Sequence, residues 1–255
     1  MPFKYHLIWL LFISCQQGPE NKINRVLSPS ISLEPGDHKI ADIPLPPGFT
    51  RVSYPQNSFA DWLRKINIKK DKNVYLYNGR FKNNQQAQFA VLDISIGDRD
   101  LQQCADAVMR LRAEYLYDQK KFDALKFTDY EGGIYTFQPP YTRVHFDSYL
   151  QTVFGMCGSA SLARQMNLQN WQSVKPGDVL IRGGFPGHAV TIMDLARNEN
   201  GDIIYLLSQS YMPAQSIHIL NNPAHESLSP WYRVNDDALI RTPEYTFKRE
   251  ELKQW

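Results

Sequence analysis

The sequence predicts an α+β protein with one folded domain. Three observations support this class. One long stretch has apolar residues three and four positions apart, several short apolar runs are separated by Asn-Gly turns, and 43% of the residues are hydrophobic against 21% charged. The first pattern is typical of an amphipathic helix and the second of antiparallel strands. A chain of 255 residues with this composition is expected to bury a core.

The N-terminus predicts export. Lys4 and His6 precede a short apolar stretch, residues 7–13, and Phe12-Ile13-Ser14-Cys15 resembles the lipobox of a bacterial lipoprotein signal. That resemblance implies a signal peptide over residues 1–14 and a mature chain anchored to a membrane through lipidated Cys15. The protein would then be located in the bacterial cell envelope, at the outer membrane or facing the periplasm. The alternative is a plain secretory signal that happens to contain a cysteine.

A flexible tether is expected over residues 15–42, because Pro and Gly recur there without hydrophobic periodicity. The folded domain is predicted over residues 43–255, with a mixed first half (43–140) and a second half (141–255).

In the first half, Ser58 is placed to cap a short helix over residues 59–63. Two strands, residues 74–77 and 89–96, are expected around the turn Asn78-Gly79. Residues 100–118 have the strongest helical periodicity in the chain, and Cys104 lies on the apolar stripe of that helix. Cys104 is therefore predicted to be a core residue.

The second half follows the breaks Gly132-Gly133 and Pro139-Pro140. A helix is expected from about residue 146 to 153. Three strands should then follow over residues 178–181, 188–195 and 203–210, the last two joined by the turn Asn200-Gly201.

Cys157 and His188 form the candidate catalytic pair. Cys157 lies in a Gly- and Ser-rich run, residues 155–162, and His188 follows a Gly-rich loop at a strand entrance. A neutral imidazole can accept the thiol proton, and the imidazolium then stabilises the thiolate. The alternatives are a histidine bonded to backbone and a structural Cys157, which in an oxidising compartment could pair with Cys104.

A base also needs an orienting partner, and an acyl intermediate needs a hydrogen-bond donor. Gln209, on the strand expected to face His188, is the first choice for the partner, ahead of Ser208, Ser210 and Asp194. Gln151 stands six residues before Cys157 and is the candidate donor. A helix that ran unbroken through Cys157 would deprive the thiol of a helix N-terminus.

Nothing in the sequence predicts a cofactor, a metal or a nucleic acid as partner. The net charge is +2, and the densest basic stretch, Lys69-Lys70, adjoins Asp71. The histidines lie in separate segments, with no paired cysteines and no Gly-rich phosphate loop.

Two stretches, residues 100–115 and 208–215, together with Asn222-Pro223 and Pro230-Trp231-Tyr232, resemble the bacterial family filed as domain of unknown function 4846. The resemblance extends from about Ile43 onward. It implies an exported bacterial protein and no established activity.

A second resemblance covers residues 147–220. Cys157, then Lys175-Pro176-Gly177-Asp178-Val179, then Gly187-His188-Ala189-Val190 is similar in order to the NlpC-type and amidase-type cell-wall hydrolases of the papain-like superfamily. This implies a helix followed by an antiparallel sheet, with Cys157 as nucleophile, His188 as base and Gln209 as orienting residue. Those enzymes carry Asp before the nucleophile, where this chain has Met156.

These observations lead to one functional hypothesis and two rivals. The first is hydrolysis of a cell-wall peptide amide through a Cys157 thioester. The second is a non-catalytic module that binds a glycan or peptide in a cleft walled by His188, Tyr211, Trp231 and Tyr232. The third is a scaffold lipoprotein that contacts other envelope proteins.

Overall fold

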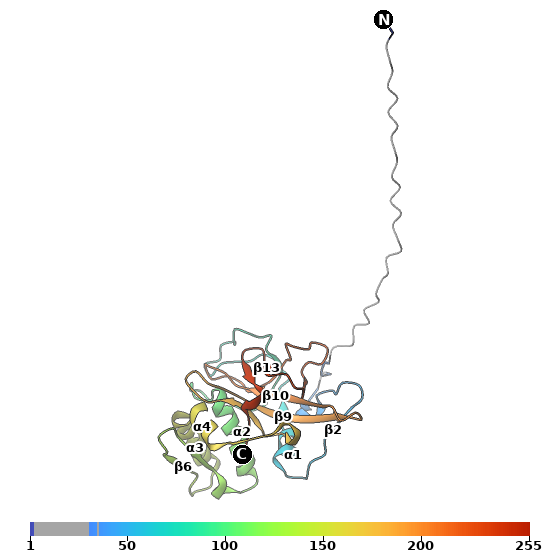
Figure 1. Cartoon of the computed structure of the whole chain (residues 1–255). Helices are drawn as coiled ribbons and strands as arrows, with labels where there is room; N and C mark the ends of the chain where they lie inside the picture. The colour runs from blue at the N-terminus through green and yellow to red at the C-terminus, as the bar shows by residue number, and fades with distance from the viewer. Residues whose placement is uncertain (3–30, 35) are drawn as a thin grey trace.

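The computed structural model describes residues 1–2, 31–34 and 36–255 (Figure 1). Cys15 and nearly all of the predicted signal peptide lie outside these residues. Of the predicted tether, residues 31–34 and 36–42 are described. Its last part belongs to the folded body, because strand β1 (His38–Lys39) pairs with β3 (Asn67–Ile68) and Ile40 is fully buried. The folded part therefore begins before Ile43.

The architecture is α+β, as the sequence predicts. A nine-stranded sheet has the order β4-β11-β10-β9-β8-β15-β7, and its strand pairings are antiparallel. These strands are Gln88–Val91 (β4), His218–Leu220 (β11), Ile203–Gln209 (β10), His188–Asn198 (β9), Val179–Arg182 (β8), Leu252–Gln254 (β15) and Asn167–Leu168 (β7). Two short strands complete it: β12 (Tyr232–Arg233) pairs with β10, and β2 (Phe49–Arg51) pairs with β9.

Four α-helices accompany the sheet: α1 (Phe59–Arg64), α2 (Cys104–Asp118), α3 (Arg143–Met156) and α4 (Ser159–Gln165). Helices α2, α3 and α4 lie together beside β9 and β10 (Figure 1). Their apolar side chains form one core cluster with Val179, Ile181 and Ala189 of β8 and β9. The helices thus cover one face of the central strands.

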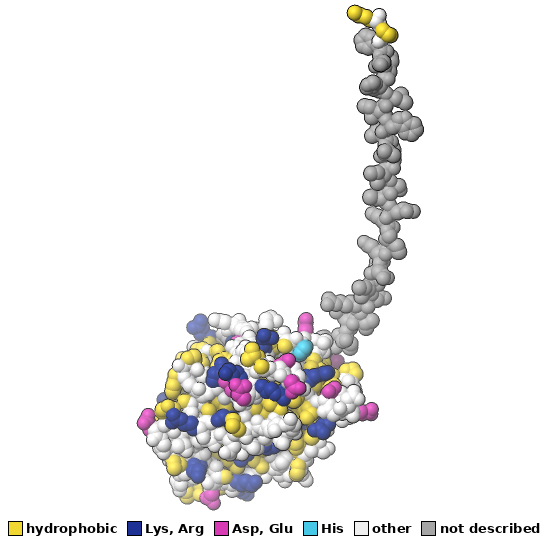
Figure 2. Space-filling view, in the orientation of Figure 1, with side chains coloured by type: hydrophobic (Ala, Val, Ile, Leu, Met, Phe, Trp, Pro, Cys, Tyr) yellow, Lys and Arg dark blue, Asp and Glu magenta, His cyan; other side chains and the backbone are white. Residues whose placement is uncertain are grey.

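Two separate hairpins and four short 3₁₀ turns complete the fold. The hairpins are β5 (Lys126–Thr128) with β6 (Ile134–Thr136), and β13 (Leu239–Arg241) with β14 (Thr246–Lys248). The 3₁₀ turns are η1 (Ile40–Asp42), η2 (Phe122–Ala124), η3 (Trp171–Ser173) and η4 (Arg249–Glu251). Figure 2 shows acidic and basic side chains interspersed over the face in view, as expected from the nearly balanced composition.

Several predicted elements are confirmed. Ser58 caps α1 by accepting a hydrogen bond from the Asp61 amide at 3.2 Å. The three strands expected in the second half are β8, β9 and β10, and Gly201 in the turn between β9 and β10 has φ +85°, which glycine adopts without strain.

The helix expected over residues 100–118 begins only at Cys104. Gln103 has extended backbone angles, and its amide donates to the Asp106 carboxylate at 3.0 Å. The polar run before Cys104 is therefore outside the helix, although apolar residues such as Leu101 continue the helical period. Cys104 is the first residue of α2, and periodicity alone does not locate that boundary.

The helix predicted at residues 146–153 is α3, and it ends before Cys157. Cys157 has extended backbone angles (φ −104°, ψ 147°), and its amide donates to Val153 O at 2.8 Å. Helix α4 starts two residues later. Cys157 thus lies between two helices, at the C-terminus of α3 and directly before Gly158, the N-cap of α4.

The expected first-half hairpin is wrong. Residues 74–77 form only isolated bridges, one of them Tyr75 to Phe81 across the Asn78-Gly79 turn. Strand β4 pairs with β11 of the second half, and β2 pairs with β9. The two halves share one sheet because these long-range pairings replace the local one.

Asp194 ties the N-terminal segment to the sheet. Its fully buried carboxylate lies on β9 and accepts from Arg51 Nε of β2 at 2.8 Å and from Arg64 Nε of α1 at 2.6 Å. It therefore neutralises two guanidinium groups from different elements and does not contact His188.

We expect Asp194→Asn to lower the free energy of unfolding by about 3 kcal/mol, because two partly buried guanidinium groups lose their common counter-charge. Asp37→Asn is the control: it removes an exposed pair, Asp37 with Lys70 at 3.1 Å, and should change stability by less than about 0.5 kcal/mol. Urea denaturation monitored by circular dichroism measures both. Equal stability of the two variants would contradict this role for Asp194.

Candidate functional site

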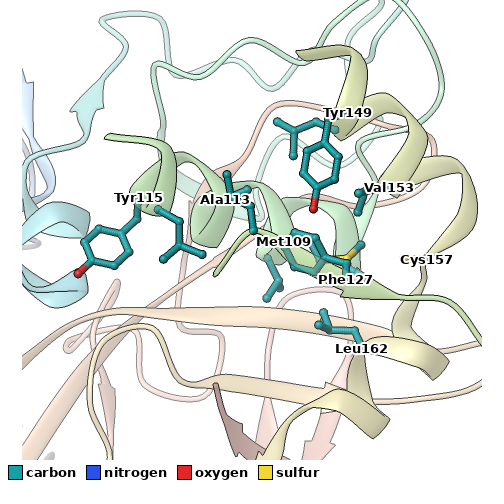
Figure 3. Close-up of a cluster of buried hydrophobic side chains, with 14 of the residues drawn as sticks. Met109, Ala113, Tyr115, Phe127, Tyr149, Val153, Cys157 and Leu162 are labelled. Atoms are coloured by element: carbon teal, nitrogen blue, oxygen red, sulfur yellow. The ribbon is translucent and has the colours of Figure 1, made fainter. Parts of the chain in front are cut away.

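Cys157 lies in the hydrophobic core. Its side chain packs in the cluster formed by α2, α3, α4 and β5, among Met109, Phe127, Val153 and Leu162 (Figure 3), and only 5% of the residue is exposed. Burial raises the pKa of its thiol to about 12, with smaller contributions from Asp129 and Asp106. In the described structure the thiol makes no hydrogen bond to His188. The structure therefore does not bring the predicted nucleophile to the predicted base.

His188 and Gln209, in contrast, meet as expected. His188 is the first residue of β9 and Gln209 the last of β10, and His188 Nε2 lies 2.9 Å from Gln209 Oε1. Tyr211 and Tyr245 pack against the imidazole with ring centroids 4.9 Å away, and Phe247 stacks on it at 5.7 Å. The side chains of the other candidates for the orienting role, Ser208, Ser210 and Asp194, do not bond His188.

The second ring nitrogen of His188 is free. His188 is fully buried, and its Nδ1 has no hydrogen-bond partner among the described residues. Burial lowers the pKa of the imidazole to about 4, although the hydrogen bond to Gln209 acts in the opposite direction. The ring is therefore neutral at pH 7, and a lone pair on Nδ1 can accept a proton from a neighbouring group.

Cys104 is the first residue of α2, which packs against β9, the strand that begins at His188. The backbone amide of Ala189 acts to lower the pKa of the Cys104 thiol. Burial acts more strongly and raises the pKa to about 11. The thiol is 6% exposed and protonated at neutral pH.

Two further contacts hold the start of α2 at these strand ends. Ser210 Oγ, directly after β10, donates to Gln102 O at 2.8 Å, and Asp100 Oδ1 accepts from the Ala214 amide at 2.7 Å. Burial, Glu244 and then the Cys104 sulfur raise the pKa of Tyr211, whose ring packs on His188. His188, Gln209 and Tyr211 therefore lie together, and the start of α2 is anchored next to them.

Gln151 lies outside this site. It is exposed on α3, and its Oε1 accepts from Arg99 Nη1 at 3.3 Å. Both side chains line a cavity of about 240 Å³ that also includes Gln102 and Arg110. The spacing of six residues relates Gln151 to Cys157, whose thiol makes no hydrogen bond to His188. The structure therefore does not place Gln151 as an oxyanion donor beside His188.

The predicted aromatic wall is also wrong at two of its residues. Trp231 is fully buried and donates its indole N–H to Pro44 O at 2.8 Å. Tyr232 is 4% exposed, stacks on Tyr205 at 5.6 Å and donates its hydroxyl to Asn221 O at 2.5 Å. Both residues are core residues of the sheet, and Tyr211 alone of the three stays beside His188.

Other classes of site receive no support from the described residues. Among residues 1–2, 31–34 and 36–255, no group of three or more His, Cys, Asp or Glu side chains is placed to hold a metal ion. Within the same residues, no helix has the length and apolarity needed to cross a membrane. Cys104 and Cys157 are both free thiols, so the disulfide considered as a rival is not formed.

A family model described as a domain of unknown function (4846) matches residues 40–139 and 134–254. The chain belongs to this family. No curated protein and no solved structure matches it. The first matched segment of family 4846 contains Cys104 and the second contains His188 and Gln209, so the site is built from both.

The helical periodicity predicts that Cys104 is a core residue, and the structure does bury it. The sequence therefore did not indicate Cys104 as a candidate site residue. A usable signal was present nevertheless. The polar run Asp100 to Gln103 precedes Cys104, and such a run favours a helix that begins at the cysteine. A cysteine at the first position of a long helix is in better electrostatic surroundings for a thiolate than one at a helix end.

The low pKa of His188 has a consequence for stability. The pKa of His188 in the folded protein, about 4, lies below the unfolded value of about 6.5. The stability that the neutral imidazole contributes is therefore fully present above pH 6.5 and is lost as the pH falls to about 4. Wild type should therefore lose about 2 to 3 kcal/mol more than His188→Gln between pH 7 and pH 4.5. Urea unfolding at the two pH values checks this, and parallel pH dependences would contradict it.

Proposed function

We propose that the protein is a cysteine hydrolase of papain-like type in which Cys104, and not Cys157, is the nucleophile. His188 is the base and Gln209 the residue that orients it. The observation that carries the proposal is the buried Nδ1 of His188, which has no partner among the described residues. Cys104 is held toward the same strand ends, because Ser210, directly after Gln209, donates to Gln102 O two residues before Cys104. An unpaired buried acceptor costs stability, so a functional role explains its retention.

The geometry supports acyl transfer. As Cys104 Sγ attacks a carbonyl carbon, its proton passes to His188 Nδ1 and a C–S bond forms. Collapse of the tetrahedral intermediate breaks the C–N bond, and Nδ1 returns the proton to the leaving amine. Water then attacks the thioester, with Nδ1 taking a proton from it. The C–S bond breaks and the proton returns to sulfur.

Helix α2 supplies donors for the intermediate. Its first backbone bond runs from the Ala107 amide to Gln103 O, so the amides of Cys104 and Ala105 precede the i→i−4 ladder. These N–H groups and the helix dipole stabilise negative charge that develops beside Cys104. In this proposal these amides, and not Gln151, are the hydrogen-bond donors to the acyl intermediate.

The resting site holds a neutral thiol and a neutral imidazole, because burial raises the pKa of Cys104 to about 11 and lowers that of His188 to about 4. The thiolate therefore forms only as the proton moves to Nδ1 during attack. A buried thiol kept protonated between turnovers is also protected against oxidation.

The proposed substrate is a peptide amide of the bacterial cell wall. This rests on the similarity to the NlpC-type hydrolases and on the signal that predicts a lipid anchor at Cys15, and so a location in the cell envelope. The binding-module alternative loses support, because Trp231 and Tyr232, which were to wall its cleft, are buried.

The test uses p-nitrophenyl acetate as an activated acyl donor. We expect one acetyl group on Cys104, located by peptide mapping, with a rate that rises as the pH passes about 4 and is level near neutrality. His188→Ala should slow acylation about 100-fold or more, since a positioned base contributes about 10²–10⁴.

The matched control is Cys157→Ala, which should acylate at the wild-type rate, whereas Cys104→Ala should not acylate. Release of amine from purified cell-wall peptides should likewise be unchanged in Cys157→Ala, slowed in His188→Ala and absent in Cys104→Ala. Acetylation of Cys157 with Cys104 unmodified would overturn the assignment.

A further inference from the structure

Gln209 has two chemically different ends, and the structure shows what each end faces. Its Oε1 lies 2.9 Å from His188 Nε2, and its Nε2 donates to Glu244 Oε2 at 2.6 Å. An ionised carboxylate only accepts hydrogen bonds, so the NH₂ end of the amide must face Glu244. The carbonyl end is then left for His188.

His218 gives an independent check of this orientation. Its Nδ1 lies 2.8 Å from Ser216 O, a carbonyl that only accepts, so Nδ1 carries the proton and Nε2 carries a lone pair. Gln209 Nε2 lies 3.4 Å from that lone pair and Lys82 Nζ 3.3 Å from it. A reversed amide would place its oxygen against both a carboxylate and a lone pair.

The orientation of Gln209 fixes the tautomer of His188. Because Gln209 Oε1 is an acceptor, His188 Nε2 must carry the proton. Nδ1 then holds the lone pair, and it is the nitrogen without a partner. This is the tautomer in which His188 can take a proton from Cys104. The opposite tautomer would leave Nδ1 protonated and unable to act as a base.

Glu244 is itself held in place. It lies in the turn of the β13–β14 hairpin, where Lys82 Nζ donates to its Oε2 at 2.6 Å; the exposed fractions of the two side chains are 6% for Lys82 and 14% for Glu244. The same hairpin brings Tyr245 and Phe247 against the His188 ring. One C-terminal hairpin thus encloses the imidazole and supplies the carboxylate behind Gln209.

We propose that Glu244 is a positioning residue, which acts through the Gln209 amide to keep the proton of His188 on Nε2 and the lone pair on Nδ1. This inference rests on the proposed function, since only a base for Cys104 needs that tautomer. Lys82 serves the same end by holding the Glu244 carboxylate in place.

The direct test is the tautomer of His188 in full-length protein labelled with ¹⁵N-histidine, read by long-range ¹H–¹⁵N correlation at pH 7 and assigned by comparison with His188→Gln. We expect the wild type to show Nε2 protonated and Nδ1 unprotonated. In Glu244→Leu the amide can turn, and the form protonated at Nδ1 should appear. Glu244→Gln retains an acceptor for Gln209 and should keep the wild-type tautomer.

Two further variants separate positioning from loss of fold. Lys82→Met/Glu244→Leu removes both buried charges together, so no unpaired charge remains, and it should still show the altered tautomer. Glu250→Gln is the matched control: Glu250 belongs to the same C-terminal segment and forms an exposed pair with Lys248 at 3.6 Å. It should leave His188 unchanged.

Acylation of Cys104 by p-nitrophenyl acetate should follow the tautomer. The rate should fall about tenfold or more in Glu244→Leu and in the double variant, be restored relative to Glu244→Leu in Glu244→Gln, and stay at the wild-type level in Glu250→Gln. A wild-type tautomer in both Glu244→Leu and the double variant would overturn the inference while leaving the proposed function standing. A tautomer that shifts as expected in a protein whose wild-type Cys104 never acylates would overturn the proposed function and leave the effect of Glu244 on the tautomer standing.

Discussion

The antiparallel pairing of β9 with β10 is the constraint on which the candidate site depends. The turn Asn200-Gly201 joins the two strands, and a register shift between Leu206 and Leu207 places Ser208 opposite Thr191. This brings the first residue of β9 and the last of β10 to one end of the sheet. His188 and Gln209 therefore become neighbours although they are 21 residues apart. Helix α2 packs on the same strands, and its first residue lies at the same end, where Ser210 binds Gln102.

Burial controls the chemistry of this end of the sheet. The same desolvation that lowers the pKa of His188 raises that of Cys104, so the resting pair is uncharged. The polar groups behind the histidine have partners: Gln209, Glu244, Lys82 and His218 hydrogen-bond one another within the network. In such a low-dielectric network each donor and acceptor limits the orientation of the next. The hydrogen-bond network ends at His188 Nδ1, which has no partner among the described residues.

The two cysteines among the described residues lie in different environments. Both are buried free thiols with raised pKa values. Cys157 follows the end of α3 among apolar side chains, and the charged groups that affect it are the carboxylates of Asp129 and Asp106. Cys104 opens α2, whose first amides precede the i→i−4 ladder, and α2 packs on β9. In the proposed function this second setting supplies the donors for an oxyanion.

The sequence by itself determined the α+β class, the capped helix after Ser58, strands β8 to β10 and the likeness to family 4846, because local periodicity and turn residues act over a few positions. It also indicated His188 with Gln209, since a short turn makes neighbours of successive strands. Only the tertiary structure decided which cysteine begins the helix that is anchored at the end of β10, that Trp231 and Tyr232 are core residues, that β4 pairs with β11, and that Glu244 lies behind Gln209. Each of these depends on contacts between segments distant in sequence, and hydrophobic pattern shows only that a residue is buried, never what it is buried against.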